Sequence, residues 1–334
     1  MGAARPRVSR PAAWRLSAVG VALLIAAAVT PVPAAPPEAR IPWIGYLANE
    51  ATPDSAPVLR DTLRERGWVE GESVKIWYRY AQGKPDFYSQ HADDLVRLNV
   101  NAIVAVGPGA IVAARKATKT IPIVMVSLDD PAQLVRESAG PAANLTGITT
   151  FAPDAPARRV DLLRQVVPRL ARAALLWSAD SPAASAELRA TEAAAGARGV
   201  ELAKVEVTNE TDVREALTQI EKLRTQGLIV LADAVTLAHR QRLATFASRN
   251  KLPAVFPSRD FADAGGLLAY GANWTDVFRQ VGALVDQILR GGRPADLGIR
   301  RAARFELVVN LRAARALPVT VPVSLLQRAD RVIE

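Results

Sequence analysis

The sequence has no cysteine and only two histidines among its 334 residues. Without cysteine the chain has no disulfide, no thiolate nucleophile, no zinc–thiolate site and no residue to carry a lipid anchor. The histidines, His91 and His239, lie far apart, each in a segment typical of a surface helix. A metal site would need three carboxylates or ligands from distant segments. We therefore expect no metal and no other cofactor.

Short catalytic signatures are also missing. The chain contains neither the G-x-S-x-G turn of α/β-hydrolases nor a P-loop. Residues 107–110 follow a predicted strand and open a helix, as a dinucleotide site does, but the third glycine is absent. These absences favour a protein that is not an enzyme. The alternative left open is an exported hydrolytic enzyme that uses cleft carboxylates.

Acidic residues are absent from the first 35 positions. Four arginines there precede an apolar run over 16–29, and small residues follow at 32–35. This order is typical of a secretory signal peptide, so we expect residues 1–34 to be removed on export. The apolar run of about 14 residues is shorter than the ~20 that a membrane-spanning helix needs. A retained anchor remains the alternative.

The charge of the chain is modest outside this leader. The formal net charge is +9, and four of the positive charges belong to the leader. The densest remaining cluster, Arg300, Arg301 and Arg304, is too short for a nucleic-acid footprint. We therefore expect no nucleic-acid partner. An exported chain without cysteine is expected to work in the periplasm.

Short apolar runs rich in β-branched residues alternate with amphipathic helical patterns. The predicted strands are 41–47, 74–80, 102–107, 121–127, 145–149, 173–178, 200–207, 227–233, 252–258, 266–271 and 305–310. The predicted helices are 57–66, 87–98, 110–118, 157–167, 183–198, 211–224, 235–249 and 275–289. Strand–helix alternation at this spacing predicts parallel sheets with right-handed crossovers.

The same strand–helix order occurs twice, in 41–127 and in 171–258. The predicted fold class is therefore α/β, with two similar doubly wound parallel-sheet lobes joined by a hinge. The predicted boundaries are 1–34 for the signal peptide, 41–148 plus 259–292 for lobe 1, and 149–258 plus 293–334 for lobe 2.

Polar residues collect at the predicted carboxyl ends of strands, where open α/β sheets bind ligands. The turn at 107–110 enters a helix, and its unpaired N–H groups suit a carboxylate or phosphate. Asp129, Asp180 or Asp233 would suit a ligand ammonium, although Asp180 and Asp233 could equally cap the helices that follow. The candidate ligand-binding residues are Asn49, Glu50, Gly107, Gly109, Ala110, Ser127, Asp129, Thr149, Asp180, Asp233 and Ser258.

Eight segments together resemble one protein family. They are 63–71, 76–86, 117–124, 130–131, 144–147, 261–271, 305–311 and 322–334. In these segments the chain resembles the ABC-transporter substrate-binding proteins of the TrpX-like group. The resemblance implies the type I periplasmic-binding-protein fold across nearly all of the mature chain.

The resemblance also implies a function. A monomer would capture a small organic solute between two lobes, close about a hinge and deliver the solute to a membrane permease. Similar members are associated with aromatic amino acids and related organic solutes, so the expected solute is an amino acid or an aromatic or carboxylate-bearing compound. They often carry a hydroxyl residue after the glycine that matches Gly107, but Pro108 stands there. Gly109 would then supply the donor. A lobed transcriptional regulator is disfavoured by the export signal, and a sensor role stays open.

Overall fold

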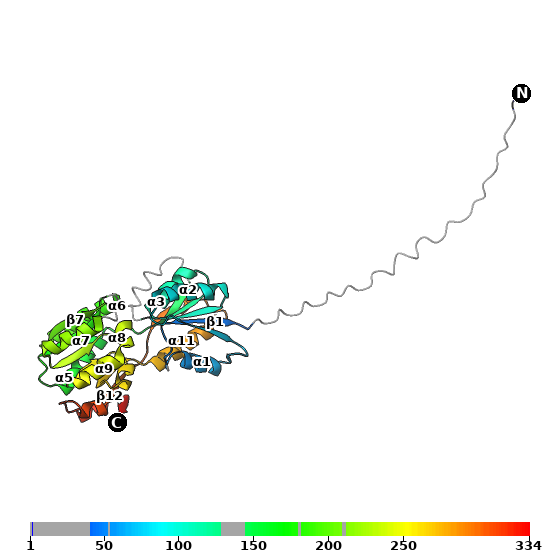
Figure 1. The fold of residues 1–334 in the computed structure, drawn as a ribbon. Helices are drawn as coiled ribbons and strands as arrows, with labels where there is room; N and C mark the ends of the chain where they lie inside the picture. Colours follow the sequence, from blue (N-terminus) through cyan, green and yellow to red (C-terminus); the bar gives the residue numbers. More distant parts are fainter. Residues whose placement is uncertain (1, 3–40, 53, 128–143, 180–181, 209–211) are drawn as a thin grey trace. The chain divides into compact units, whose positions relative to one another are not determined.

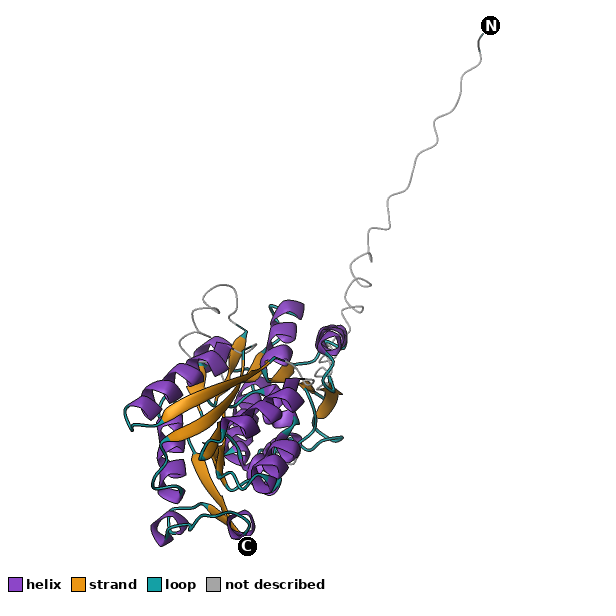
Figure 2. Cartoon of the chain, turned by 60° about the vertical axis from the view of Figure 1, so that its left-hand side comes forward, coloured by secondary structure: helices purple, strands orange, loops and turns teal. Residues whose placement is uncertain are grey.

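The structure is a computed structural model, and it describes residues 2, 41–52, 54–127, 144–179, 182–208 and 212–334. Apart from Gly2, the predicted signal peptide at 1–34 lies outside the described residues. Residues 41–334 build two separate β-sheets, each with helices on both faces (Figures 1 and 2).

The first sheet has six strands in the order β11-β5-β4-β3-β1-β2, and all of its pairs are parallel. Its strands are β1 (Trp43–Ala48), β2 (Lys75–Tyr80), β3 (Ala102–Val106), β4 (Ile123–Ser127), β5 (Leu145–Thr149) and β11 (Ile299–Arg301). The central strands are continuous apolar runs because helices cover them on both sides. Ile44 of β1, for example, lies opposite Ile76 and Ala102.

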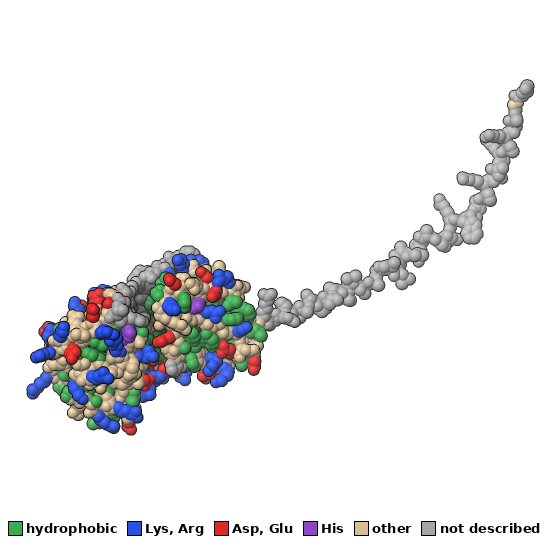
Figure 3. Space-filling view, viewed as in Figure 1, with side chains coloured by type: hydrophobic (Ala, Val, Ile, Leu, Met, Phe, Trp, Pro, Cys, Tyr) green, Lys and Arg blue, Asp and Glu red, His purple; other side chains and the backbone are tan. Residues whose placement is uncertain are grey.

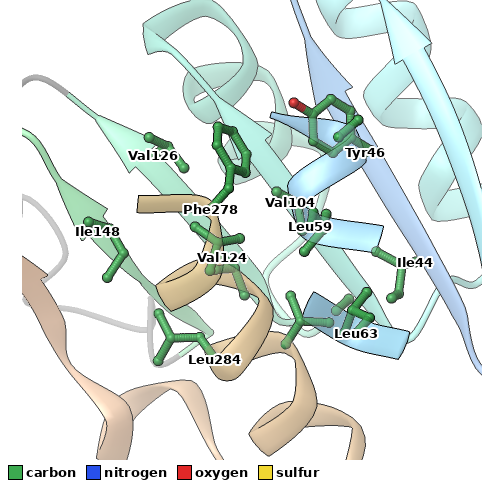
Figure 4. Close-up of a cluster of buried hydrophobic side chains, with 14 of the residues drawn as sticks. Ile44, Tyr46, Leu59, Leu63, Val104, Val124, Val126, Ile148, Phe278 and Leu284 are labelled. Carbon is green, nitrogen blue, oxygen red and sulfur yellow. The ribbon is translucent and has the colours of Figure 1, made fainter. Parts of the chain in front are cut away.

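Two pairs of helices cover this sheet. The first pair is α1 (Ala56–Glu65) with α11 (Trp274–Leu289), and the second is α2 (Pro85–Arg97) with α3 (Pro108–Ala117). Leu59 and Leu63 of α1 and Phe278 of α11 pack onto Ile44 and Val124 of the sheet (Figure 4). This sheet, its four helices and the short α12 (Pro294–Leu297) are called the first lobe below.

The second sheet has seven strands in the order β13-β12-β10-β9-β8-β6-β7. Its strands are β6 (Arg172–Ser178), β7 (Glu201–Val207), β8 (Gly227–Val230), β9 (Ala254–Phe256), β10 (Leu268–Ala272), β12 (Phe305–Asn310) and β13 (Arg331–Ile333). All pairs are parallel except β10 with β12, which is antiparallel.

Helices cover both faces of the second sheet as well. One buried cluster joins it to α5 (Ala155–Val166), α6 (Pro182–Gly196), α13 (Leu311–Arg315) and α14 (Val323–Leu326). The other joins it to α7 (Asp212–Leu223), α9 (Arg240–Arg249) and α10 (Arg259–Asp263). The short α8 (Ala234–Ala238) follows β8. The second sheet and these helices are called the second lobe.

The predicted α/β fold with two similar lobes is confirmed. The first five strands of each lobe run in the same spatial order, β2-β1-β3-β4-β5 and β7-β6-β8-β9-β10. Each of the eleven predicted strands corresponds to an observed strand. The predicted helix over 235–249 is interrupted at His239, which lies between α8 and α9 with φ −97° and ψ 14°.

Four elements, α10, β10, α12 and β11, lie in the other lobe from the one that the predicted boundaries imply. Those boundaries assign 259–292 to lobe 1, but α10 and β10 belong to the second lobe because β10 pairs with β9. They assign 293–334 to lobe 2, but β11 pairs with β5 in the first sheet. β10 continues the second sheet directly after β9, its neighbour along the chain. β11 instead adds to the open edge of the first sheet from a distant part of the chain, and local sequence does not reveal that pairing.

The chain passes between the lobes at three places. It leaves the first lobe after β5, returns after β10 through Asn273, and leaves again between β11 and β12. The crossings are tied to one another. The Asn273 N–H donates to the Arg304 carbonyl at 3.0 Å, and the Ala302 N–H donates to the Thr149 carbonyl at 2.7 Å.

Candidate ligand-binding site

The strand order marks where a ligand site belongs in each lobe. In doubly wound sheets of this order, the crevice for a ligand opens at the carboxyl ends of the strands where the order reverses. Here those points lie between β1 and β3, and between β6 and β8. The turns after β3 and β8 therefore occupy equivalent positions, and both contain predicted site residues.

The turn after β3 presents backbone N–H groups. Gly107 has φ +86°, a conformation that favours glycine, and its N–H donates to the Val126 carbonyl at 2.9 Å. Gly109 and Ala110 carry N–H groups of the first turn of α3, which lack a carbonyl partner within the helix. Together with the helix dipole, these groups suit a carboxylate.

An aromatic ring that sequence reasoning missed lies against this turn. A Cβ added to Gly109 would lie 2.7 Å from Cε2 of Tyr88 in α2. The glycine therefore lets the half-buried Tyr88 ring approach the backbone at the start of α3. Nothing in the local sequence relates these two residues, because they belong to successive helices that are brought together only when both pack on the sheet.

The other candidates of the first lobe fall at the ends of neighbouring strands. Asn49 follows β1, and its Oδ1 accepts the Gly83 N–H at 2.7 Å. Ser127 and Thr149 end β4 and β5, lie opposite each other in the ladder, and are buried. The Thr149 hydroxyl accepts the Phe151 N–H at 3.0 Å. Asn49 thus joins the loop after β1 to the loop after β2, and Thr149 stabilises a local turn, both at the same edge of the sheet as Gly107.

Asp233 is the most informative residue after β8. It is 7% exposed and caps α8, where its Oδ1 accepts the Thr236 N–H at 2.8 Å. Its Oδ2 is buried and has no hydrogen-bond partner among the described residues. The pKa of Asp233 is raised to about 6, chiefly by burial and to a smaller extent by the nearby Glu187 carboxylate, against hydrogen bonds from Thr236 and Val235 that lower it. The structure therefore leaves one carboxylate oxygen without the cation or donor that buried anions require.

The remaining candidates divide into two groups. Ser258 follows β9 beside β8, is 8% exposed, and donates through its hydroxyl to Oδ2 of Asp260 at 3.0 Å. Asp129 and Asp180 lie outside the described residues.

A buried ion pair behind Asp233 was not anticipated from the sequence. Arg159 of α5 is 4% exposed, pairs through Nη1 with Oε1 of Glu187 in α6, and donates through Nε to the Tyr270 carbonyl at 3.0 Å. Oε2 of Glu187 accepts the N–H of Ala232 at 3.2 Å. The amphipathic pattern of α5 provides no signal that an arginine would be interior.

Two further ion pairs connect the lobes through the loop after β1. Asp54 of the first lobe pairs with Arg259 of α10, and its Oδ1 also accepts the hydroxyl of Thr275 at 3.2 Å. Glu50, a predicted site residue, pairs with Arg240 of α9 at 3.5 Å. Both acidic residues of this loop thus contact basic residues of the second lobe. No local sequence pattern indicates either pairing, because the partners are about 190 to 205 positions apart.

No cluster of metal-binding side chains occurs among the described residues. No helix in the same part of the chain has the length and apolar character needed to cross a membrane. On the face drawn in Figure 3, Lys and Arg side chains are spread over both lobes with Asp and Glu between them. The expectation of no nucleic-acid partner stays a prediction.

Similar proteins with solved structures share this two-lobed fold. A conserved domain protein from Vibrio cholerae matches with a TM-score of 0.80 at 24% identity, covering 88% of this chain and 100% of that one. The ABC domain from Streptococcus pneumoniae, solved in complex with L-Trp, also matches with a TM-score of 0.80. It is 22% identical, and the match covers 87% of this chain and 99% of that one.

Sequence comparison indicates the same kinship. A tyrosine-binding protein of Clostridioides difficile is 20% identical over 257 residues, which is 76% of this chain and 74% of that protein. The family model described as ABC transporter substrate binding protein matches residues 50–333. The predicted family resemblance is confirmed, and the chain belongs to the ABC transporter substrate-binding protein family.

Proposed function

We propose that this chain is the periplasmic solute-binding component of an ABC importer and that its solute is an amino acid, with aromatic side chains preferred. The solute would bind between the carboxyl ends of the two sheets. The observation that carries the proposal is the buried Oδ2 of Asp233, which has no partner among the described residues. A ligand ammonium supplies the charge and the donors that this oxygen lacks.

The first lobe offers the complementary groups. The N–H groups of Gly109 and Ala110 at the start of α3 suit the carboxylate of an amino acid. Tyr88 beside Gly109 provides an aromatic surface against which a flat side chain can pack. The relatives support this choice of solute, because one is a tyrosine-binding protein and another was solved with L-Trp.

Closure about the three crossings would trap the solute. The pairs Asp54–Arg259 and Glu50–Arg240 join the lobes, so they favour the closed state over an open one. Ligand binding would then shift the open–closed equilibrium further toward the closed state, which these ion pairs already favour.

Replacing Asp54 with Asn tests this bias. We expect affinity for the solute to fall about fivefold, chiefly through faster dissociation, because a partly exposed ion pair contributes roughly 1 kcal/mol. Stopped-flow fluorescence at low and high salt measures the effect, which should shrink as salt rises. The control is Asp94→Asn, which removes an ion pair within α2. Equal dissociation rates for the two variants would contradict the latch role of Asp54.

The leader and the family support the protein's cellular setting. The predicted signal peptide favours export to the periplasm, and the family favours delivery of a small solute to a membrane permease. We propose that the protein acts as a monomer and has no catalytic activity. Glu187 is the carboxylate whose charge acts on Asp233. One of its oxygens pairs with Arg159 and the other accepts the Ala232 N–H, so Glu187 is poorly placed to act with Asp233 as a catalytic acid–base pair.

A thermal-shift screen of residues 35–334 tests the function directly. The panel contains the common amino acids, aromatic carboxylic acids without an amine, aromatic amines without a carboxylate, nucleosides and short peptides. A ligand at a hundred times its Kd stabilises the protein by roughly 2.7 kcal/mol, which raises Tm by a few degrees. We expect L-Trp or L-Tyr to raise Tm and the compounds lacking either charged group to have little effect.

Recovery of the ligand separates binding from catalysis. After incubation, mass spectrometry should return the stabilising amino acid chemically unchanged. A compound that is consumed would instead support the exported hydrolase. Stabilisation only by compounds without an amine would contradict the role of Asp233.

A further inference from the structure

The Arg159–Glu187 pair is buried deeply for a charged pair. The side chain of Arg159 is 5% exposed and that of Glu187 is 15% exposed. Taking two charges out of water is costly, and hydrophobic residues of similar volume often stabilise a protein at least as well. Stability alone therefore explains this pair poorly, and its other contacts indicate a further role.

Those contacts converge on the segment that carries Asp233. Oε2 of Glu187 accepts the N–H of Ala232, the residue immediately before Asp233. Nε of Arg159 binds the Tyr270 carbonyl near the end of β10 at 3.0 Å, so the pair ties α5, α6, β10 and the turn after β8 together. The backbone that positions the Asp233 carboxylate is thus held by Glu187, and Glu187 is held by Arg159.

The pair also sets the charges around Asp233. Glu187 of α6 raises the pKa of Asp233, although burial is the larger cause. From α8, the N–H groups of Val235 and Thr236 act in the opposite direction. His239 at the end of α8 is the other titratable side chain on that helix, and Arg159 of α5 lies behind Glu187.

We propose that Arg159 and Glu187 are positioning residues for ligand binding: the pair fixes the turn at Ala232 and places a negative charge behind Asp233, so that this carboxylate meets a ligand cation in a fixed place. The identity of the ligand cation in this inference rests on the proposed function. The effect of Glu187 on Asp233 does not depend on that function. The negative charge of Glu187 adds to the attraction for an ammonium, while Arg159 holds the Glu187 carboxylate in place.

The first test needs no ligand. Carboxyl-detected NMR follows the titration of Asp233 in the chain from residue 35, in wild type, Glu187→Gln and Glu187→Asp. Gln removes the negative charge and leaves Arg159 unpaired, so we expect the titration midpoint of Asp233 to fall by about one pH unit. Asp keeps the charge, so its midpoint should stay close to that of wild type. A midpoint that is the same in all three proteins overturns the electrostatic half of the proposal.

The second test separates positioning from stability. The double variant Arg159→Met/Glu187→Met replaces the pair with neutral side chains of similar volume and should still fold, because it leaves no buried charge unpaired. Because the Ala232 N–H loses its acceptor, we expect affinity for L-Trp or L-Tyr to fall at least tenfold. Wild-type affinity in the folded double variant overturns the positioning role.

The two tests also distinguish this inference from the proposed function. If neither amino acid binds wild type, the solute assignment fails, while the NMR titration still decides whether Glu187 acts on Asp233. If wild type binds and depends on Asp233, but the Glu187 variants and the double variant behave like wild type, the inference fails alone.

Discussion

Asp233→Asn is expected to lose binding of L-Trp or L-Tyr by about 100-fold or more, and at the same time to raise the stability of the ligand-free protein above pH 6. The loss follows because an amide cannot neutralise a ligand ammonium, and removing one member of a buried charge pair typically costs about 2–5 kcal/mol. Asn is as good an N-cap as Asp, so α8 should keep its first turn. Isothermal titration at pH 8 measures the affinity.

The gain in stability follows from the raised pKa of Asp233. The folded protein holds this proton up to about pH 6, whereas the unfolded chain releases it near pH 4. Between these values the folded state binds more protons, so the wild-type free energy of unfolding falls as pH rises through this window. The Asn variant does not carry this penalty. Its advantage should be absent below about pH 4 and reach about 1–3 kcal/mol at pH 8.

Urea unfolding at pH 4 and pH 8 checks this second half. The control is Asp154→Asn, which removes a carboxylate at the exposed N-cap of α5, where the side chain makes no capping hydrogen bond. That control should change neither affinity nor the pH profile. If Asp233→Asn binds within threefold of wild type, Asp233 is not the ammonium site. If the stability advantage of the Asn variant does not grow with pH, the ionised Asp233 carboxylate does not destabilise the ligand-free wild-type protein.

Gly271→Ala should destabilise the protein strongly, although it adds only one methyl group. A Cβ at Gly271 in β10 would lie 1.8 Å from the Pro257 carbonyl oxygen and 2.9 Å from the Pro257 carbonyl carbon. Both atoms are backbone, so no rotamer change relieves the clash, and the loop after β9 must move. We expect a loss of about 3 kcal/mol or more, or failure to accumulate as soluble protein.

The matched control for this substitution is Gly196→Ala. Gly196 ends α6, is exposed, and has no atom within 4 Å of an added Cβ. Alanine there should be neutral or stabilise by up to about 1 kcal/mol, because glycine is a poor helix former. Urea midpoints for both variants provide the comparison. A midpoint for Gly271→Ala equal to that of wild type would show that the β9–β10 contact is not as close as described.

The interior strands were predictable because their sequences are decisive. The run Ala-Ile-Val-Ala-Val at 102–106 places apolar side chains on both faces of a strand, so both faces must be buried. β3 is indeed covered by helices on both sides. The helix starts were less precise: α2 and α3 begin at Pro85 and Pro108, two residues before the predicted starts, because proline fits the first turn of a helix. These local patterns were sufficient for the two-lobed α/β prediction.

The edges of the sheets were not predictable in the same way. β11 consists of Ile299, Arg300 and Arg301, a polar segment with no strand pattern, and it pairs with β5 because that edge of the first sheet is open. β12 pairs antiparallel with β10, because the chain enters the second lobe from the crossing after β11. Such pairing depends on where the chain path places a segment that is distant in sequence, so the local sequence does not predict it.

The candidate site shows the same division. The sequence alone predicted the turn after Gly107 and the carboxylate of Asp233 as candidates, because both follow apolar strands and precede helices, where parallel sheets expose their ligand-binding ends. It could not distinguish a capping aspartate from a ligand-binding one. That distinction depends on the burial of Oδ2, on Glu187 behind it and on Arg159 behind Glu187, which come from three helices separated in the chain. Periodicity determines which face of an element is buried, whereas only the packed tertiary structure determines which charges share that interior.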